Sequence, residues 1–103
     1  MKYKLLSLDT STTATGWSLF NNGKYINSGV IDLKKSKNTS ERIKNMVVQI
    51  MGMIDHHSPT VVAIETPVVC RNPLTQRLLT MIFGVVYGKC VESNIDFVEL
   101  KPT

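Results

Sequence analysis

Two apolar segments of the chain each end in a carboxylate. Residues 5–8 lead directly into Asp9, and residues 61–64 lead directly into Glu65. Short apolar runs of this kind are typical of strands buried in a sheet. If the two strands are parallel neighbours, they lie about 4.8 Å apart and both acids emerge at the edge where open α/β sheets bind ligands. Because adjacent carboxylates repel, one of them then holds a proton or a cation lies between them.

The chemistry that suits this pair is that of a hard divalent cation. Carboxylate oxygens favour Mg²⁺, or Mn²⁺ in its place, over zinc. A cation held in this way can activate water and stabilise charge on a phosphoryl oxygen. Each acid also has a structural explanation, since Asp9 could bond to the turn at Thr10-Ser11 and Glu65 could pair with Arg71. The matched placement of the two acids favours the metal site.

The elements that must position these acids alternate along the chain. Asn22-Gly23 lies between two apolar runs and predicts a hairpin turn, because both residues tolerate positive φ. Asn38 or Ser40 can cap a first helix that ends before Ser58-Pro59, and Asn72-Pro73 begins a second. The expected order is strands over residues 4–8, 17–20 and 25–31, the first helix, a strand over 61–64, a helix over 73–92 and a strand over 96–100. This order predicts an α/β fold in one domain, residues 1–103, with a mixed sheet of three antiparallel strands and then two parallel ones.

The second helix carries apolar residues on more than one side. One stripe contains Leu74, Leu78, Met81, Ile82 and Val85, and another contains Leu79, Phe83, Val86 and Cys90. The pattern predicts burial on two sides, with one side on the sheet and the other against a second subunit or a further helix. Gly84 and Gly88 would permit close approach of that partner. The alternative is a plain core helix in a small domain.

The composition excludes several classes of protein. The chain has 103 residues, of which 43% are apolar, too many for a disordered chain, and no apolar run is long enough to span a membrane. No signal peptide opens the sequence, and Cys70 and Cys90 lack the spacing of metal ligands, so we expect a reduced, cytoplasmic protein. The net charge of +4 divides into +5 over residues 1–51 and −1 over residues 52–103, which suits a polyanionic partner.

Two stretches resemble the motifs of a known family. The opening hairpin of RuvC-type Holliday-junction resolvases is similar to residues 6–20, which read Leu-Ser-Leu-Asp-Thr-Ser-Thr-Thr-Ala-Thr-Gly-Trp-Ser-Leu-Phe. Their second motif is similar to residues 62–73, which read Val-Ala-Ile-Glu-Thr-Pro-Val-Val-Cys-Arg-Asn-Pro. Gly84 fits the helix that follows. The resemblance covers essentially the whole chain.

The resemblance implies an RNase H-like fold and a homodimeric, Mg²⁺-dependent endonuclease that cuts four-way DNA junctions in recombination and repair. Asp9 and Glu65 match its first two catalytic carboxylates. Dimerisation is expected through the helix over residues 73–92. Where the family often has an aromatic residue against DNA bases, this chain has Val68. The other catalytic acids of the family lie on a helix after the fifth strand, so we expect a truncated chain that lacks cleavage activity by itself.

A DNA partner gives a function to basic residues along the chain. The residues expected to contact DNA are Arg71, Asn72, Arg77, Lys34 and Lys35. Arg71 and Arg77 follow the second acid and could neutralise phosphates there. Lys34 and Lys35, together with Lys37, form a loop that is only solvated in most proteins but could contact phosphates in a DNA-binding one.

Two other functions remain open. Actin-like, Hsp70-like and sugar-kinase-like ATPases also begin with a strand, an Asp, a hydroxyl-rich turn and a second strand, and they bind ATP phosphates at the turn. They need a second Gly-rich loop, and the six glycines here do not cluster. The second alternative is a DNA-binding or dimerisation module without catalysis. His56-His57 is explained by a helix C-terminus, which favours cations, and Cys70 has no neighbour that would activate it as a nucleophile.

Overall fold

The computed structural model describes residues 3–67 and 71–101. Its elements, in order, are β1 (Lys4–Thr10), β2 (Ala14–Asn21), β3 (Lys24–Asp32), α1 (Thr39–His57), β4 (Val61–Glu65), α2 (Pro73–Glu92) and β5 (Asp96–Leu100). The predicted order of strands and helices is therefore confirmed. The first two strands extend further than their apolar runs, because the backbone ladder continues through the polar pair Thr10 and Thr15.

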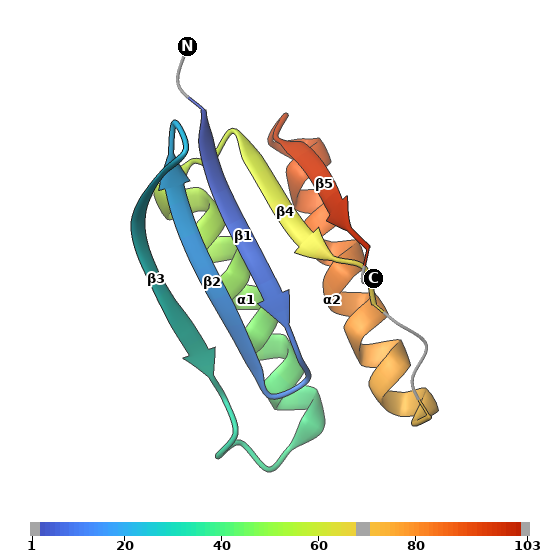
Figure 1. Cartoon of the computed structure of the whole chain (residues 1–103). Helices are drawn as coiled ribbons and strands as arrows, with labels where there is room; N and C mark the ends of the chain where they lie inside the picture. Colours follow the sequence, from blue (N-terminus) through green and yellow to red (C-terminus); the bar gives the residue numbers. More distant parts are fainter. Residues whose placement is uncertain (1–2, 68–70, 102–103) are drawn as a thin grey trace.

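The five strands form one mixed sheet in the order β3-β2-β1-β4-β5 (Figure 1). β1 pairs antiparallel with β2, and β2 pairs antiparallel with β3. β4 pairs in parallel with β1 on one side and with β5 on the other. The predicted α/β fold, with three antiparallel strands and then two parallel ones, is confirmed. Both helices lie on the same face of the sheet (Figure 1).

The core lies between that face and the two helices. In β1 and β4 the residues that point to the helices are fully buried, with Leu6 and Val62 at 0% exposure. The core residues of the helices are Ile43, Met46, Ile50 and Ile54 from α1, and Ile82, Val86 and Cys90 from α2. This packing fixes the two parallel strands side by side, which is what the candidate site requires.

Local signals in the sequence account for the ends of these elements. Asn22 and Gly23 have φ of 51° and 83°, so the predicted hairpin turn is present between β2 and β3. Of the two expected caps of α1, the structure uses Asn38, whose side chain accepts a hydrogen bond from the Glu41 N–H at 3.0 Å. Ser58 is the C-cap of α1, and its backbone is left-handed with φ of 46°.

In this chain α2 packs one stripe of residues against the core, and the members of that stripe differ from the two predicted groupings. Ile82, Val86 and Cys90 are spaced four residues apart and face the core, so this stripe takes members from both predicted ones. Phe83 packs beside them, with its ring 5.3 Å from that of Phe97. The members of the predicted stripes on the opposite side are exposed: Leu74 and Met81 at 52%, and Val85 at 36%. No atom lies within 4 Å of a Cβ built at Gly84 or Gly88, so neither glycine serves a close approach among the described residues.

The last turns of the two helices are joined by an ion pair. Lys89 Nζ of α2 lies 2.8 Å from Asp55 Oδ1 of α1. The hydrogen bond to Asp55 raises the pKa of Lys89. This contact fixes the ends of α1 and α2 that are distant from the candidate site.

Candidate active site

The structure brings Asp9 and Glu65 to neighbouring positions at one end of the sheet. The parallel register pairs Leu8 of β1 with Ile64 of β4, so the two acids are the next residues of adjacent strands. Adjacent strands lie about 4.8 Å apart. Both acids are exposed, whereas Leu8 and Ile64 just before them are buried. Each strand therefore delivers its carboxylate to solvent at the point where the core ends, as the sequence predicted.

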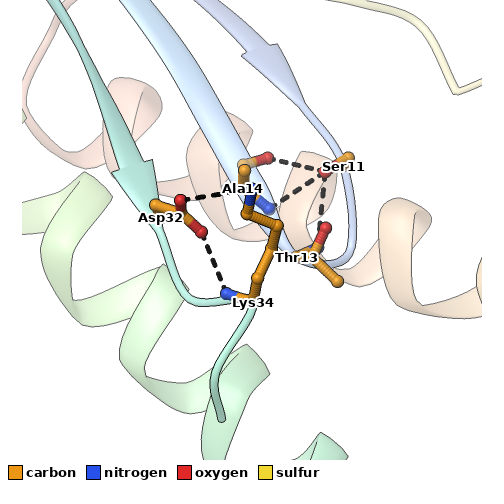
Figure 2. Close-up of polar contacts among 5 residues, drawn as sticks. All are labelled: Ser11, Thr13, Ala14, Asp32 and Lys34. Carbon is orange, nitrogen blue, oxygen red and sulfur yellow. Dashed lines mark hydrogen bonds and ion pairs between the residues drawn. The ribbon is translucent and has the colours of Figure 1, made fainter.

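Neither carboxylate has the structural role that the alternative explanations gave it. The turn after β1 is held by Ser11, whose hydroxyl accepts from the Ala14 N–H at 3.0 Å and donates to the Ala14 carbonyl at 2.8 Å (Figure 2). Within residues 3–67 and 71–101, Asp9 takes no hydrogen bond from this turn, and Glu65 forms no ion pair with Arg71. The two acids are therefore free to bind a ligand.

A small hollow lies against Glu65. Its volume is about 140 Å³, and its lining residues are Thr10, Glu65, Thr66, Pro67 and Leu79. On the β2 side, Asp9 is paired with Gly16, and no atom lies within 4 Å of a Cβ built there. Open space therefore lies against Glu65 and beside Gly16, the β2 partner of Asp9.

Four lining residues were not predicted as part of the site: Thr10, Thr66, Pro67 and Leu79. Leu79 was assigned to a dimerisation stripe, but it lines the hollow below Glu65. Thr66 follows Glu65 directly, its N–H donates to the Leu100 carbonyl at 2.9 Å, and its hydroxyl donates to Glu99 Oε2 at 3.0 Å. The only sequence signal for Thr66 is its position after an acid that ends a strand.

The donor set fits one hydrated divalent cation. Carboxylates are hard oxygen ligands, and Mg²⁺ commonly binds proteins through one or two carboxylates while keeping several waters. In the part of the chain that the structure describes, no group of three or more His, Cys, Asp or Glu residues could hold a metal ion. The pair is therefore suited to part of a metal site rather than to a complete cage of protein ligands.

The residues expected to contact DNA belong to two segments near this end of the sheet. The loop that carries Lys34 and Lys35 follows β3, and Arg71, Asn72 and Arg77 lie at the start of α2 (Figure 1). All five residues are exposed. Val68 and Cys70 lie outside the described residues.

Two of these five residues also bond to their own segments. The Lys34 N–H donates to Asp32 Oδ1 at 3.0 Å, and Lys34 Nζ lies 3.7 Å from Asp32 Oδ2 (Figure 2). Both side chains are largely exposed, so this ion pair leaves the Lys34 ammonium accessible. Asn72 is the cap of α2, since its Oδ1 accepts from the Leu74 N–H at 2.9 Å. Its proposed contact with DNA must therefore coexist with a structural role.

The histidine pair lies in the last turn of α1, as predicted, and is not part of the candidate site. The rings of His56 and His57 are 4.8 Å apart, and that of His57 is 5.9 Å from Trp17. Burial, and after it the neighbouring His56, lowers the pKa of His57. Because α1 runs away from the end of the sheet where it begins, these imidazoles cannot serve the two carboxylates.

The family models match the crossover junction endodeoxyribonuclease RuvC over residues 5–103. The curated relatives include RuvC proteins from Hydrogenovibrio crunogenus, 29% identical over 97% of this chain, and Chromobacterium violaceum, 30% identical over 92% of it. The chain spans 60% and 54% of the lengths of these two proteins. No helix among the described residues is long and apolar enough to cross a membrane.

Solved structures share the fold. Thermus thermophilus RuvC in complex with a Holliday junction substrate superposes with a TM-score of 0.77 at 13% identity, over 97% of this chain and 65% of that one. The Fowlpox virus resolvase with Holliday junction DNA gives 0.68 at 18% identity, over 97% and 61% of the two chains. Pseudomonas aeruginosa YeaZ gives 0.59 at 17% identity, over 96% and 44%. At these identities the likeness concerns the fold alone.

Proposed function

This chain belongs to the family of RuvC crossover junction endodeoxyribonucleases, and we propose that it supplies two catalytic carboxylates of a nuclease acting on four-way DNA junctions. The observation that carries the proposal is the pair of exposed acids, Asp9 and Glu65, on adjacent parallel strands, neither of which has an ion-pair partner among the described residues. A place in DNA recombination and repair and a cytoplasmic location belong to the same proposal and are supported by the family.

In this proposal the protein's residues hold a cation and the DNA strand in a fixed relation. Asp9 and Glu65 would hold Mg²⁺, or Mn²⁺ in its place. When bound, such a cation lowers the pKa of a coordinated water and stabilises charge on the phosphoryl oxygens. Arg71 and Arg77 neutralise nearby phosphates, and binding by these cations releases counterions from DNA.

The remaining contacts place the junction rather than cut it. Lys34 and Lys35 lie on the other side of the acids, across β1, β2 and β3, and are proposed to bind a more distant phosphate. Asn72 is proposed to form a hydrogen bond to the DNA backbone near the phosphate that Arg71 contacts. Contacts of this kind fix the register of the DNA without reading its sequence.

Metal binding can be tested on the 103-residue chain itself. Addition of Mn²⁺ should broaden the backbone NMR signals of residues near Asp9 and Glu65. The affinity for Mn²⁺ should be weak, because two carboxylates make an incomplete cage. Asp9→Asn or Glu65→Gln should abolish this broadening. The matched control is Asp96→Asn, which removes an exposed acid at the opposite end of the sheet. Equal loss in the control variant, or broadening centred elsewhere, would reject the metal site.

Cleavage tests the rest of the proposal. We expect the 103-residue chain to leave a labelled four-way junction intact in Mg²⁺. We expect a polypeptide of the same length as the relatives to cleave the junction. Asp9→Asn or Glu65→Gln should abolish this cleavage while junction binding persists. Binding persists because loss of a negative charge reduces repulsion of the phosphates. Full cleavage by either variant would show that these carboxylates are not catalytic.

A homodimer through α2 is part of the same proposal. An apolar groove of about 580 Å³ runs between the two helices, and its lining residues are Thr39, Ser40, Ile43, Lys44, Val47, Val48, Leu74, Leu78 and Met81. Exposed apolar side chains of α2, such as Met81, lie along it. A two-fold dimer uses the same patch on both subunits, so one continuous apolar surface is sufficient.

The structure changes which substitutions test the dimer. Leu79→Glu and Phe83→Glu, which the helical stripes suggest, would place a charge beside the hollow or in the core. Met81→Glu instead changes an exposed residue of the groove and should shift sedimentation toward the monomer. Val91→Glu is the control, since Val91 is 62% exposed on α2 but lies outside the groove. A monomer at high concentration for the unmodified protein would contradict the dimer.

A further inference from the structure

Arg42 bonds to two separate loops at the end of the sheet where the acids lie. It lies near the start of α1, and its side chain is partly buried. Nε donates to the Thr12 carbonyl at 2.7 Å, and Nη1 donates to the Ser36 carbonyl at 3.1 Å. Among residues 3–67 and 71–101, no carboxylate forms an ion pair with it. Its charge is therefore used on backbone oxygens alone.

The first of the two loops is the turn between β1 and β2, which begins two residues after Asp9. Within the turn, Ser11 bonds to the N–H groups of Thr13 and Ala14. From outside the turn, Leu33, the first residue after β3, donates its N–H to the Thr13 carbonyl at 2.8 Å. Arg42 adds the bond from the helix layer, so that the turn is held from two directions.

The second loop joins β3 to α1 and carries Lys34 and Lys35. Its internal bonds are few: the Ser36 N–H donates to the Leu33 carbonyl at 3.0 Å, and the Lys34 N–H donates to Asp32. Figure 2 shows the Asp32–Lys34 end of this loop beside the Ser11–Ala14 turn. Arg42 bonds to the loop at Ser36, directly after the two lysines.

We propose that Arg42 is a positioning residue: it holds the turn beside Asp9 at a fixed spacing from the loop that carries Lys34 and Lys35. The proposal rests on the proposed function, because the spacing matters only if Asp9 binds the cation and the lysines bind the same DNA. An arginine is suited to this role, since its planar guanidinium presents several donors in fixed directions. A lysine has one compact ammonium and cannot set the relative position of two carbonyls in the same way.

A purely structural Arg42 would anchor the start of α1 and do no more. Its loss would then lower stability and leave unchanged the order of the two loops, which the bond from Leu33 to Thr13 already joins. If Arg42 is a positioning residue, its loss should instead lower the order of both loops together. Lys34 and Lys35 should then contribute less to DNA affinity. These outcomes can be separated by measuring local order and DNA affinity in the same variants.

The first measurement is the NMR order parameter of backbone amides in the 103-residue chain. With Arg42→Gln, the order parameters of residues 11–14 and 34–37 should fall from about 0.85 toward 0.6, while those of β4 and α2 stay unchanged. Arg42→Lys should restore order in one loop only. Lys24→Gln is the matched control, because it removes one positive charge at the opposite end of β3. Unchanged order of both loops in Arg42→Gln would overturn the proposal.

The second measurement is a double-mutant cycle on affinity for a synthetic four-way DNA junction. The double substitution Lys34→Ala and Lys35→Ala should weaken junction binding. The factor by which it lowers affinity should be at least threefold smaller in the Arg42→Gln background than in the unmodified chain. An equal factor in both backgrounds would leave Arg42 purely structural and overturn the proposal. If the lysine variant binds as well as the unmodified chain, the proposed DNA contact fails, and the order parameters alone decide the role of Arg42. If Arg42→Gln does not fold, Arg42→Lys carries both measurements.

Discussion

At the scale of single residues, His57 lies in surroundings that oppose its charged form. Its ring lies against Trp17, and burial, followed by the charges of His56 and Lys4, lowers its pKa from the ordinary value of 6.5. The unfolded chain therefore takes up a proton at a pH where the folded protein does not. It follows that the stability contributed by neutral His57 is complete above pH 6.5 and decreases as the pH falls below it.

We predict that His57→Gln flattens the pH dependence of thermal stability. Between about pH 7 and pH 5, the melting temperature of the variant should fall less than that of the unmodified chain, because glutamine takes up no proton. Circular dichroism melts at several pH values measure this. His56→Gln should retain most of the dependence, since burial is the larger cause of the shift. Identical pH profiles for His57→Gln and the unmodified chain would contradict the argument.

Single residues also show which parts of the site a sequence can reveal. Asp9 and Glu65 were predictable, because each ends an apolar run and the parallel order of the strands then places them together. Arg42 was not predictable in the same way. Its partners are backbone carbonyls 30 and 6 residues away. Because every residue has a backbone carbonyl, the identities of Thr12 and Ser36 do not indicate these bonds. Bonds to backbone become visible only when the fold is known.

At the scale of elements, the start of α2 combines a helix cap with a proposed DNA contact. Asn72 Oδ1 accepts from the N–H groups of Leu74 and Thr75. We predict that Asn72→Ala lowers the free energy of unfolding by about 1 kcal/mol, because the first turn loses its cap. Asn72→Asp should retain stability, since aspartate also caps and its charge suits a helix N-terminus. Urea denaturation of the two variants measures the difference.

The same pair of variants separates the cap from the DNA contact. Asn72→Asp adds a negative charge near the proposed phosphates, so it should weaken junction affinity even though the helix is intact. Loss of affinity in Asn72→Ala alone would instead mean that the residue acts through the fold of α2. This comparison needs no knowledge of where on the junction the helix lies.

Elements were predicted well where one physical signal dominated. The Asn-Gly turn, the proline at the start of α2 and the capping asparagines placed most boundaries within a few residues. The grouping of the apolar residues of α2 into two stripes was wrong, because the helix is apolar on several sides and periodicity alone cannot choose among them. Packing decides the choice: Ile82, Val86 and Cys90 fit against the sheet, and the neighbouring stripe is left on the surface.

At the scale of the whole molecule, basic residues gather toward the end that holds the acids. The loop after β3, the start of α1 and the start of α2 all contribute to it (Figure 1). We predict that replacing Arg71 and Arg77 together with alanine reduces the slope of log affinity against log salt by about 2, since each phosphate contact contributes roughly 0.9. Junction titrations at several salt concentrations measure the slope.

The control for this prediction is a base at the other end of the sheet. Lys24→Ala removes the same kind of charge from the start of β3, distant from the proposed DNA surface. Its slope should match that of the unmodified chain. If the arginine variant also keeps the original slope, Arg71 and Arg77 are not phosphate contacts, whatever the effect of other residues.

The parallel pairing of β1 with β4 sets the order in which the site is assembled during synthesis. β1, β2 and β3 are joined by short turns and can pair as hairpins within microseconds. β4 must wait for the long crossover through α1, and the contact of Lys4 with Thr60 spans 56 residues. A nascent chain therefore displays Asp9 well before Glu65 arrives beside it. A half-made molecule therefore carries one proposed metal ligand instead of two.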